Sequence, residues 1–175
     1  MNFKSVKLSP HTLFFAVLSV LCMIIIFCFS MENSDESSET SGKLTEAAVE
    51  IIVDDYEALP HNEQAELADK IEHIIRKLAH FSLYTVLGFL VSCTAGKRKL
   101  FSKASAIVLA ICFIYACSDE LHQFFVPGRA CQFTDVLIDS TGALTGILIS
   151  MAAFLAIKIF SKNNHESIKH KKPVD

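Results

Sequence analysis

Residues Asp119–Gly146 read DELHQFFVPGRACQFTDVLIDSTGALTG, and they place a run of charged side chains between two long apolar segments. The apolar segments predict membrane-spanning helices. A charged group near lipid costs several kcal/mol unless it faces a protein interior, a watery cavity or a partner. Carboxylates and an arginine meet in this short stretch, so we expect a functional site where the two segments join.

The composition of the 175-residue chain is typical of a membrane protein, since 51% of it is hydrophobic and only 20% is charged. The formal net charge of -3 says little, because acids and bases are sorted along the chain. No basic stripe is interleaved with aromatic residues, so no nucleic-acid partner is expected. The six cysteines form no CxxC pair and lie mostly in apolar runs, which predicts no disulfide framework.

Four segments are predicted to cross the membrane as helices. Residues 13–30 carry no charge and approach the ~20 residues that a spanning helix needs. A cleaved signal peptide is the alternative for this segment, because two lysines precede it, but its apolar core is long and no A-x-A-like site follows. The second, third and fourth spans are predicted at residues 78–95, 104–126 and 136–160.

Residues 31–77 are predicted to form an acidic segment outside the cytoplasm. Residues 31–43 are acidic, serine-rich and without apolar periodicity, which is typical of a solvated linker. From Leu44 onward apolar residues recur at helical spacing, predicting an amphipathic helix that ends before Pro60. Asn62 can cap a second helix, which then continues into the second span.

The distribution of basic residues predicts the orientation. Lysines and arginines gather in residues 1–12, 97–103 and 158–175, and the acids fall mostly on the other side of the predicted spans. Because positive loops face the cytoplasm, both termini are predicted to be cytoplasmic, and the lysine-rich tail, residues 161–175, is expected to be disordered. The predicted fold is thus an all-α integral membrane protein with four transmembrane helices and an amphipathic extracytoplasmic segment. Residues 78–160 form its core.

Antiparallel spans bring the polar residues of this core to one membrane face. His80 lies at the outer start of the second span, Asp119 at the outer end of the third, and Asp139 one turn into the fourth. Residues four apart share a helix face. The predicted pocket comprises Arg76, His80, Tyr84, Asp119, Glu120, Gln123, Arg129, Asp135 and Asp139. Paired carboxylates can divide acid and base roles, and an arginine can hold a phosphate or carboxylate.

Each of these residues also has a simpler interpretation. His80 fits either a helix-to-helix hydrogen bond or proton transfer. Lys77 fits an anchor that reaches the lipid headgroups. Arg129 lies in a PGR turn, where a solvated side chain is usual, and Asp135 fits a helix N-terminus favoured by the macrodipole.

Small residues and metal ligands give two further predictions. Gly142 and Gly146 are four residues apart on the fourth span, and with Gly88 on the second they predict close helix packing. A metal site made of His80, Glu120 and His122 is conceivable, but no spacing resembles a known ligand motif. No metal and no other cofactor is therefore predicted.

Three stretches together resemble the VanZ-like family of small bacterial membrane proteins. They are RKLAHFSLYTVLGFL from Arg76, DELHQFFVPGR from Asp119 and FTDVLIDSTGALTG from Phe133, and the FCFSMENSDESSETS segment is also similar. The resemblance covers most of the chain and gives weight to Arg76, Lys77, His80, Tyr84, Gly88, Asp119, Glu120, Gln123, Arg129, Asp135, Gly142 and Gly146. The chain departs from the family pattern at Asp139, where members often carry asparagine, and near Leu83, where they carry glutamate.

The resemblance implies a protein of the bacterial cytoplasmic membrane. The family takes its name from a protein that confers resistance to teicoplanin, a lipid-tailed glycopeptide that acts on cell-wall precursors outside the membrane. It implies that the pocket recognises a lipid-linked or lipid-tailed molecule. The expected partners are the lipid bilayer, a lipid-linked cell-wall precursor or lipoglycopeptide, and a second copy of the chain.

Two other function classes stay open on the sequence. The first is an enzyme that modifies an outer-leaflet amphiphile, with Glu120 or Asp119 as acid or base, His80 carrying the proton and Arg129 holding an anionic head. The absence of a nucleophile or cofactor motif argues against it. The second is a small proton-coupled carrier in which the acids and the histidine form a relay.

Overall fold

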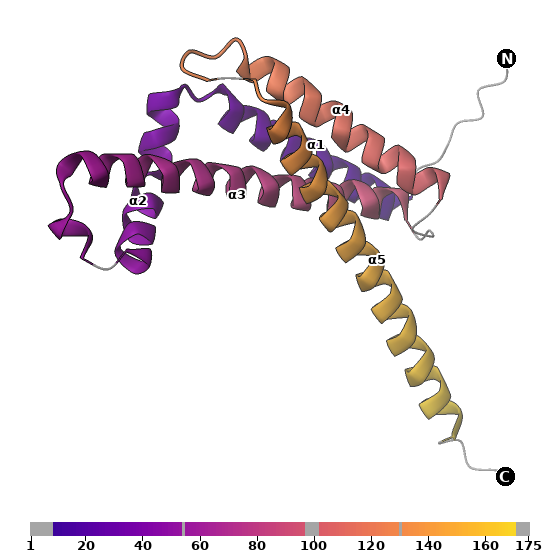
Figure 1. The fold of residues 1–175 in the computed structure, drawn as a ribbon. Helices are drawn as coiled ribbons and strands as arrows, with labels where there is room; N and C mark the ends of the chain where they lie inside the picture. The colour runs from indigo at the N-terminus through magenta and orange to yellow at the C-terminus, as the bar shows by residue number, and fades with distance from the viewer. Residues whose placement is uncertain (1–8, 54, 97–101, 130, 171–175) are drawn as a thin grey trace, which may run out of the picture.

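The computed structural model describes residues 9–53, 55–96, 102–129 and 131–170, and all regular structure in these ranges is helical. Its elements are α1 (Pro10–Met31), α2 (Ser34–Ile52), a short 3-10 helix η1 (Tyr56–Ala58), α3 (His61–Ala95), α4 (Lys103–Gln123) and α5 (Phe133–His170) (Figure 1). The predicted all-helical fold is confirmed. Lys4, Lys7, residues 97–99 and residues 171–175, which entered the orientation prediction, lie outside the described residues.

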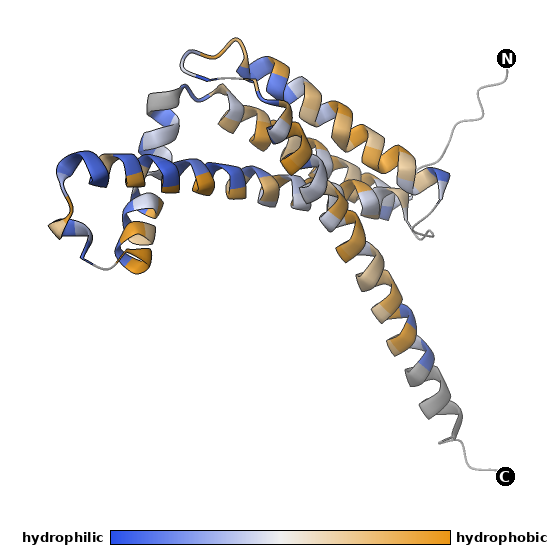
Figure 2. Cartoon of the chain, in the orientation of Figure 1, coloured by the Kyte–Doolittle hydropathy of each residue, from blue (hydrophilic) through white to orange (hydrophobic). Residues whose placement is uncertain are grey.

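Four helices are long and apolar enough to cross a membrane, as predicted: α1, α3, α4 and α5. Apolar residues predominate in α1, α4, most of α5 and the second half of α3 (Figure 2). Many of them are exposed on the outside of the bundle, as Phe14, Ile114 and Leu155 are. Such a surface is stable against lipid and not against water, so the chain is an integral membrane protein.

The helix α3 is the central support of the bundle, because it contacts each of the other four α-helices. Its 35 residues extend roughly 50 Å at the rise of an α-helix, and its first half is polar while its second half is apolar (Figure 2). The predicted outer helix and the second span are therefore one element. It begins at His61 directly after Pro60, without the side-chain cap predicted at Asn62. It ends at Ala95, where Gly96 adopts a φ of 72°.

The segment predicted as a solvated linker is helical instead. The helix α2 begins at Ser34 and not at Leu44. A capping box starts it, because the Glu36 amide donates to Asn33 Oδ1 at 2.9 Å and the Asn33 amide donates to Glu36 Oε2 at 3.2 Å. The linker prediction for residues 34–43 is thus wrong.

Serine and threonine side chains explain why the sequence of the first half of α2 resembles that of a solvated linker. The buried face of α2 carries Ser37, Ser41 and Thr45, four residues apart. The hydroxyls of Ser41 and Thr45 donate to the carbonyl four residues earlier, at 2.8 and 3.1 Å. This bond satisfies the polar group inside the helix, so a serine face can be buried against α3 without apolar periodicity. The apolar stripe of α2, which includes Leu44 and Ile51, is exposed.

Two helix ends also differ from the prediction. The helix α4 ends at Gln123, three residues before the predicted Val126, and residues 124–126 form a tight turn. Pro127 disfavours helical backbone in the residue before it, which explains the early end. The helix α5 continues to His170, so the prediction of a disordered tail is wrong for residues 161–170.

The helices α3 and α5 cross with their backbones in contact. A Cβ atom added at Gly88 would overlap the backbone of Ala143, and one added at Gly146 would overlap that of Thr85. A Cβ at Gly142 would press on the Phe81 carbonyl. Beyond this crossing, the C-terminal half of α5 runs clear of the other helices (Figure 1). The crossing fixes how the polar ends of these two helices face each other.

Candidate functional site

A polar pocket of about 200 Å³ lies where the middle of α3, the end of α4 and the start of α5 meet. Its lining residues are His73, Arg76, Lys77, His80, Glu120, Gln123, Gly128, Arg129, Gln132, Asp135 and Ile138. Six of the nine residues predicted for the pocket are among them. The remaining three, Tyr84, Asp119 and Asp139, are buried and do not line it.

The turn between α4 and α5 positions the pocket's acidic wall. The last turn of α4 supplies Glu120 and Gln123, both almost fully buried. Gly128, with a φ of 77°, then reverses the chain. The backbone amide of Gln132 donates to Glu120 Oε2 at 3.0 Å and ties the returning chain to α4. Glu120 is therefore held in one place with its carboxylate at the pocket.

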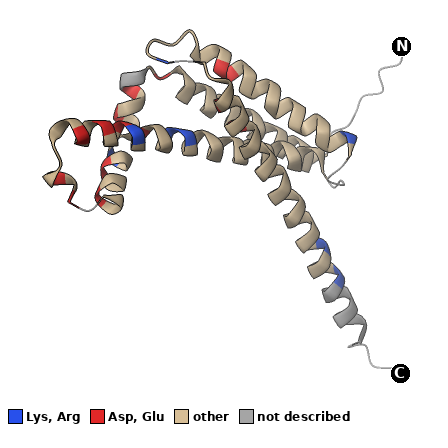
Figure 3. Ribbon diagram, viewed as in Figure 1, with Lys and Arg blue, Asp and Glu red and all other residues tan. Residues whose placement is uncertain are grey.

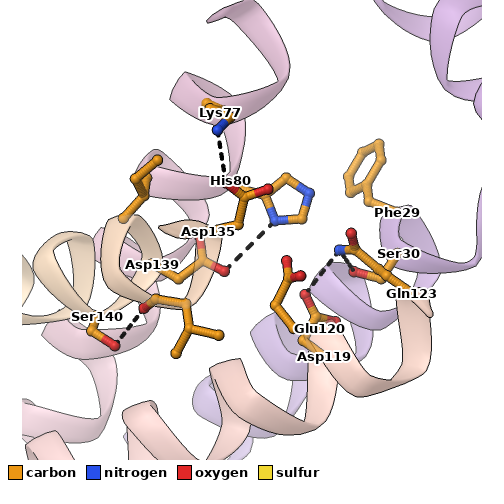
Figure 4. Close-up of polar contacts among 12 residues, drawn as sticks. Phe29, Ser30, Lys77, His80, Asp119, Glu120, Gln123, Asp135, Asp139 and Ser140 are labelled. Atoms are coloured by element: carbon orange, nitrogen blue, oxygen red, sulfur yellow. Dashed lines mark hydrogen bonds and ion pairs between the residues drawn. The ribbon is translucent and has the colours of Figure 1, made fainter. Parts of the chain in front are cut away.

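Two ion pairs join the cationic side of the pocket to its neighbours. Lys77 Nζ lies 2.8 Å from Asp135 Oδ1, which links α3 to the first turn of α5 (Figure 4). Arg76 Nη2 lies 3.5 Å from Glu72 Oε1 on the same helix. Lys77 has a specific partner, which a headgroup anchor does not require.

Arg129 is partly buried rather than freely solvated. Its Nη2 donates to the Phe29 carbonyl at 3.5 Å, and its Nε is buried without a hydrogen-bond partner. Burial, together with the nearby charge of Arg76, lowers the pKa of the Arg129 guanidinium. The Nε of Arg76 is likewise buried and unpartnered. Two guanidinium groups with unused donors therefore line one pocket, and together they can bind a multivalent anion.

Below the pocket, three helices bring two carboxylates and an imidazole together. Asp119 on α4 and Asp139 on α5 are 3% and 1% exposed, and both face His80 on α3 (Figure 4). His80 Nδ1 lies 4.0 Å from Asp139 Oδ2, and one ligand atom from each of the three residues lies within 4.8 Å of the others. Within the described part of the chain, this group could hold a metal ion. The sequence predicts no metal, and the set that it offers for comparison, His80 with Glu120 and His122, is a different one.

Tyr84 and His122 have other surroundings. Tyr84 is fully buried one turn deeper on α3, with its ring centroid 6.1 Å from that of Tyr115. His122 turns toward α1, with its ring centroid 4.8 Å from that of Phe27. Neither lines the pocket.

A second cavity of about 230 Å³ adjoins the pocket between α1, α2 and α3. Its wall is mainly apolar and includes Phe29, Leu44 and Leu83. Arg76, His80 and Arg129 line both cavities. A charged space and an apolar space therefore meet at three shared side chains.

Several residues that build the pocket were not predicted as pocket residues. Lys77 fits an anchor and also lies in a family motif, but its partner across the helices cannot be known from spacing along one helix. Ser30 accepts a hydrogen bond from Gln123 Nε2 at 3.3 Å, and Gln132 contributes a backbone amide. His73 and Gln132 also line the pocket. His73 lies four residues before Lys77 and seven before His80, so helical spacing could have found it, whereas no local pattern marks Gln132.

These features define a class: a small polytopic helical membrane protein with a charged pocket at one end of its bundle. The family model described as VanZ/LLP1 matches residues 15–156, which include all four candidate spans for most of their length and the whole pocket. The chain belongs to the VanZ-like family. No curated protein matched it, and no solved structure did.

Proposed function

We propose that this VanZ-like protein lies in the bacterial cytoplasmic membrane with both termini in the cytoplasm and the polar pocket at the outer face. The charges support this orientation. Acidic residues gather on α2 and the first half of α3 (Figure 3). Lys103 begins α4, and Lys158 and Lys162 lie in the second half of α5, toward the other end of the spans. Positive segments favour the cytoplasmic side. The exposed apolar stripe of α2 suits a helix that rests at the outer headgroup layer.

The proposed function is recognition of the anionic head of a lipid-linked or lipid-tailed molecule, which confers resistance to teicoplanin-type glycopeptides. The observation that carries it is the pair of adjoining cavities that share Arg76, His80 and Arg129. An amphiphile requires both environments, since its head needs charge and hydrogen bonds while its tail needs an apolar wall. The polar pocket supplies the first and the apolar cavity the second.

The guanidinium groups favour a phosphate or carboxylate as the head. Arg76 and Arg129 each keep a buried Nε without a partner. A buried donor that gains a charged acceptor contributes about 1.5–3 kcal/mol. Binding of such a head by this protein would act against a lipid-tailed antibiotic in one of two ways. It would either compete with the antibiotic for the antibiotic's site in the membrane, or hold the cell-wall precursor, which is the antibiotic's target, away from the antibiotic.

Susceptibility to teicoplanin and vancomycin, measured in bacteria expressing the protein, tests the resistance function. Wild type should protect against teicoplanin more than vancomycin, because vancomycin has no lipid tail. Arg129→Ala and Glu120→Gln at matched membrane levels should lose the protection. Lys70→Ala is the control, because Lys70 is an exposed cation on α3 that pairs with Glu66 and does not line the pocket. Equal susceptibility with and without wild type would refute the resistance function.

Lipid binding by the purified full chain tests recognition separately. A phosphate-headed lipid such as phosphatidic acid should bind, and diacylglycerol, which has the same tails without the phosphate, should not. Arg129→Ala should weaken binding roughly tenfold or more, as expected for loss of one charged hydrogen-bond donor. Equal binding of the two lipids would show that the head is not recognised.

A further inference from the structure

We propose that His80, Asp119 and Asp139 bind one divalent transition-metal ion between α3, α4 and α5. The three residues come from three different helices and meet beneath the polar pocket. One ligand atom from each lies within 4.8 Å of the other two. The family match assigns no ligand to any of them.

The spacing is close to what a bound ion requires. Nitrogen and oxygen ligands at 2.0–2.2 Å from a tetrahedral Zn²⁺ lie roughly 3.4 Å from each other. The observed group is somewhat wider. We expect rotation of the side chains to close the difference when an ion binds.

The carboxylate of Asp139 has no hydrogen-bond partner, and this is a second observation that points to a ligand. The residue is 1% exposed, and neither of its carboxylate oxygens has a hydrogen-bond partner. The nearest opposite group, His80 Nδ1, is 4.0 Å away, beyond hydrogen-bond reach. A buried carboxylate without partners is strongly destabilising. A cation in the space between Asp139 and His80 would remove this cost.

Asp119 supplies the second carboxylate in a prepared orientation. Its Oδ2 accepts a hydrogen bond from Gln123 Nε2 at 3.4 Å, and Gln123 Nε2 also contacts Ser30 Oγ (Figure 4). Its Oδ1 is buried and unpartnered, so it is available to an ion. Partners of this kind orient ligand side chains in metal sites.

The donor set selects the class of ion. One imidazole and two carboxylates suit Zn²⁺ or Mn²⁺, and two ionised carboxylates balance a divalent charge. Ca²⁺ prefers six to eight oxygen ligands, which three residues do not supply. Three protein ligands leave a position open, as in catalytic zinc sites. Because His80 also lines the polar pocket, water or an anionic oxygen in the pocket is placed to fill that position.

Metal content and thermal unfolding of the purified full chain test the proposal. Protein stripped with a chelator is incubated with Zn²⁺, Mn²⁺ or Ca²⁺, desalted and analysed for bound metal. Wild type should retain one Zn²⁺ or Mn²⁺ per chain, and its Tm should rise with metal concentration. Asp139→Asn and Asp119→Asn should bind the ion at least roughly tenfold more weakly. Glu66→Gln, which changes an exposed carboxylate of α3, should behave as wild type.

The Tm of Asp139→Asn distinguishes a lost metal site from damaged folding. In chelator it should equal or exceed that of wild type, because a buried unpaired carboxylate has been replaced. With metal it should fall below wild type. Equal retention by wild type and Asp139→Asn, an equal response to Ca²⁺, or no response to any ion would overturn the proposal and leave a protonated carboxyl pair in its place. No lipid enters this measurement, so its failure does not affect the proposed recognition of an anionic head.

Discussion

The helices α3 and α5 meet in two different ways within a few turns. At Gly88, Gly142 and Gly146 their backbones touch, and no side chain separates them. One turn away, His80 and Asp139 face each other across 4.0 Å without a hydrogen bond. The first region is closely packed and the second contains buried polar atoms without partners. The glycine crossing therefore keeps the polar groups buried together, because helices that approach so closely leave large side chains beside them little room to turn away.

This division of roles is common where stability and function share one element. Close packing of small residues holds membrane helices together, because lipid tails are as apolar as the core and provide no other driving force. Polar groups inside a membrane are costly, and their retention indicates a use. The close packing at the crossing therefore offsets the cost of burying the polar groups of the site. Altering each region in turn separates the two roles.

The largest expected effect comes from closing the space at the crossing. Gly146→Ala places a Cβ against the backbone of Thr85, which cannot move as a flexible side chain would. The helices must separate, at a cost of about 2–3 kcal/mol in the free energy of unfolding. Unfolding of the purified protein in detergent, followed by its helical signal, measures the loss.

The same substitution at Gly42 on α2 is the matched control. No atom lies within 4 Å of a Cβ at this position. Because alanine has the higher helix propensity, Gly42→Ala should be neutral or stabilise α2 by up to about 1 kcal/mol. Equal losses at Gly146 and Gly42 would mean that the crossing is not what holds α3 against α5.

The two regions also differ in how far the sequence predicted them. Spacing along single helices predicted that Gly142 and Gly146 would share a face, and that Arg76 and His80 would do so. Those patterns are local. Pairs such as Lys77 with Asp135, and the approach of Asp119 to Asp139, depend on the tilt and rotation of one helix against another. No periodicity within a helix encodes these angles, so the pocket's members could be predicted in large part but not their partners.

The prediction of a solvated linker was wrong for a different physical reason. Hydrophobic periodicity is the main signal for a helix, and residues 34–43 lack it. The helix is instead started by the capping box at Asn33 and buried through hydroxyls that bond to their own backbone. A search for the box, an Asn followed three residues later by Glu, would have located the start of α2.

A smaller effect is expected from the ion pair that joins the two regions. Lys77 and Asp135 link α3 to α5 at the pocket, and their side chains are about a quarter exposed. Solvent screening limits such a pair, so the interaction energy should be about 1 kcal/mol or less. A double-mutant cycle of Lys77→Ala and Asp135→Ala, read by unfolding at low and high salt, measures it. A coupling near zero at low salt would show that the crossing alone positions α5.

The smallest effect is expected at the far end of the crossing, where the hydroxyls of Ser92 and Ser150 share a hydrogen bond. Interhelical hydrogen bonds in membranes contribute about 0.6 kcal/mol on average, so Ser150→Ala should lower the free energy of unfolding by about that amount. Ser82→Ala is the control, because the Ser82 hydroxyl is exposed and bonds to the Leu78 carbonyl of its own helix. If Ser150→Ala cost as much as Gly146→Ala, hydrogen bonding rather than backbone contact would hold α3 and α5 together. The burial of Asp139 would then depend on Ser150, and metal retention should fall in the Ser150 variant as is expected for Asp139→Asn.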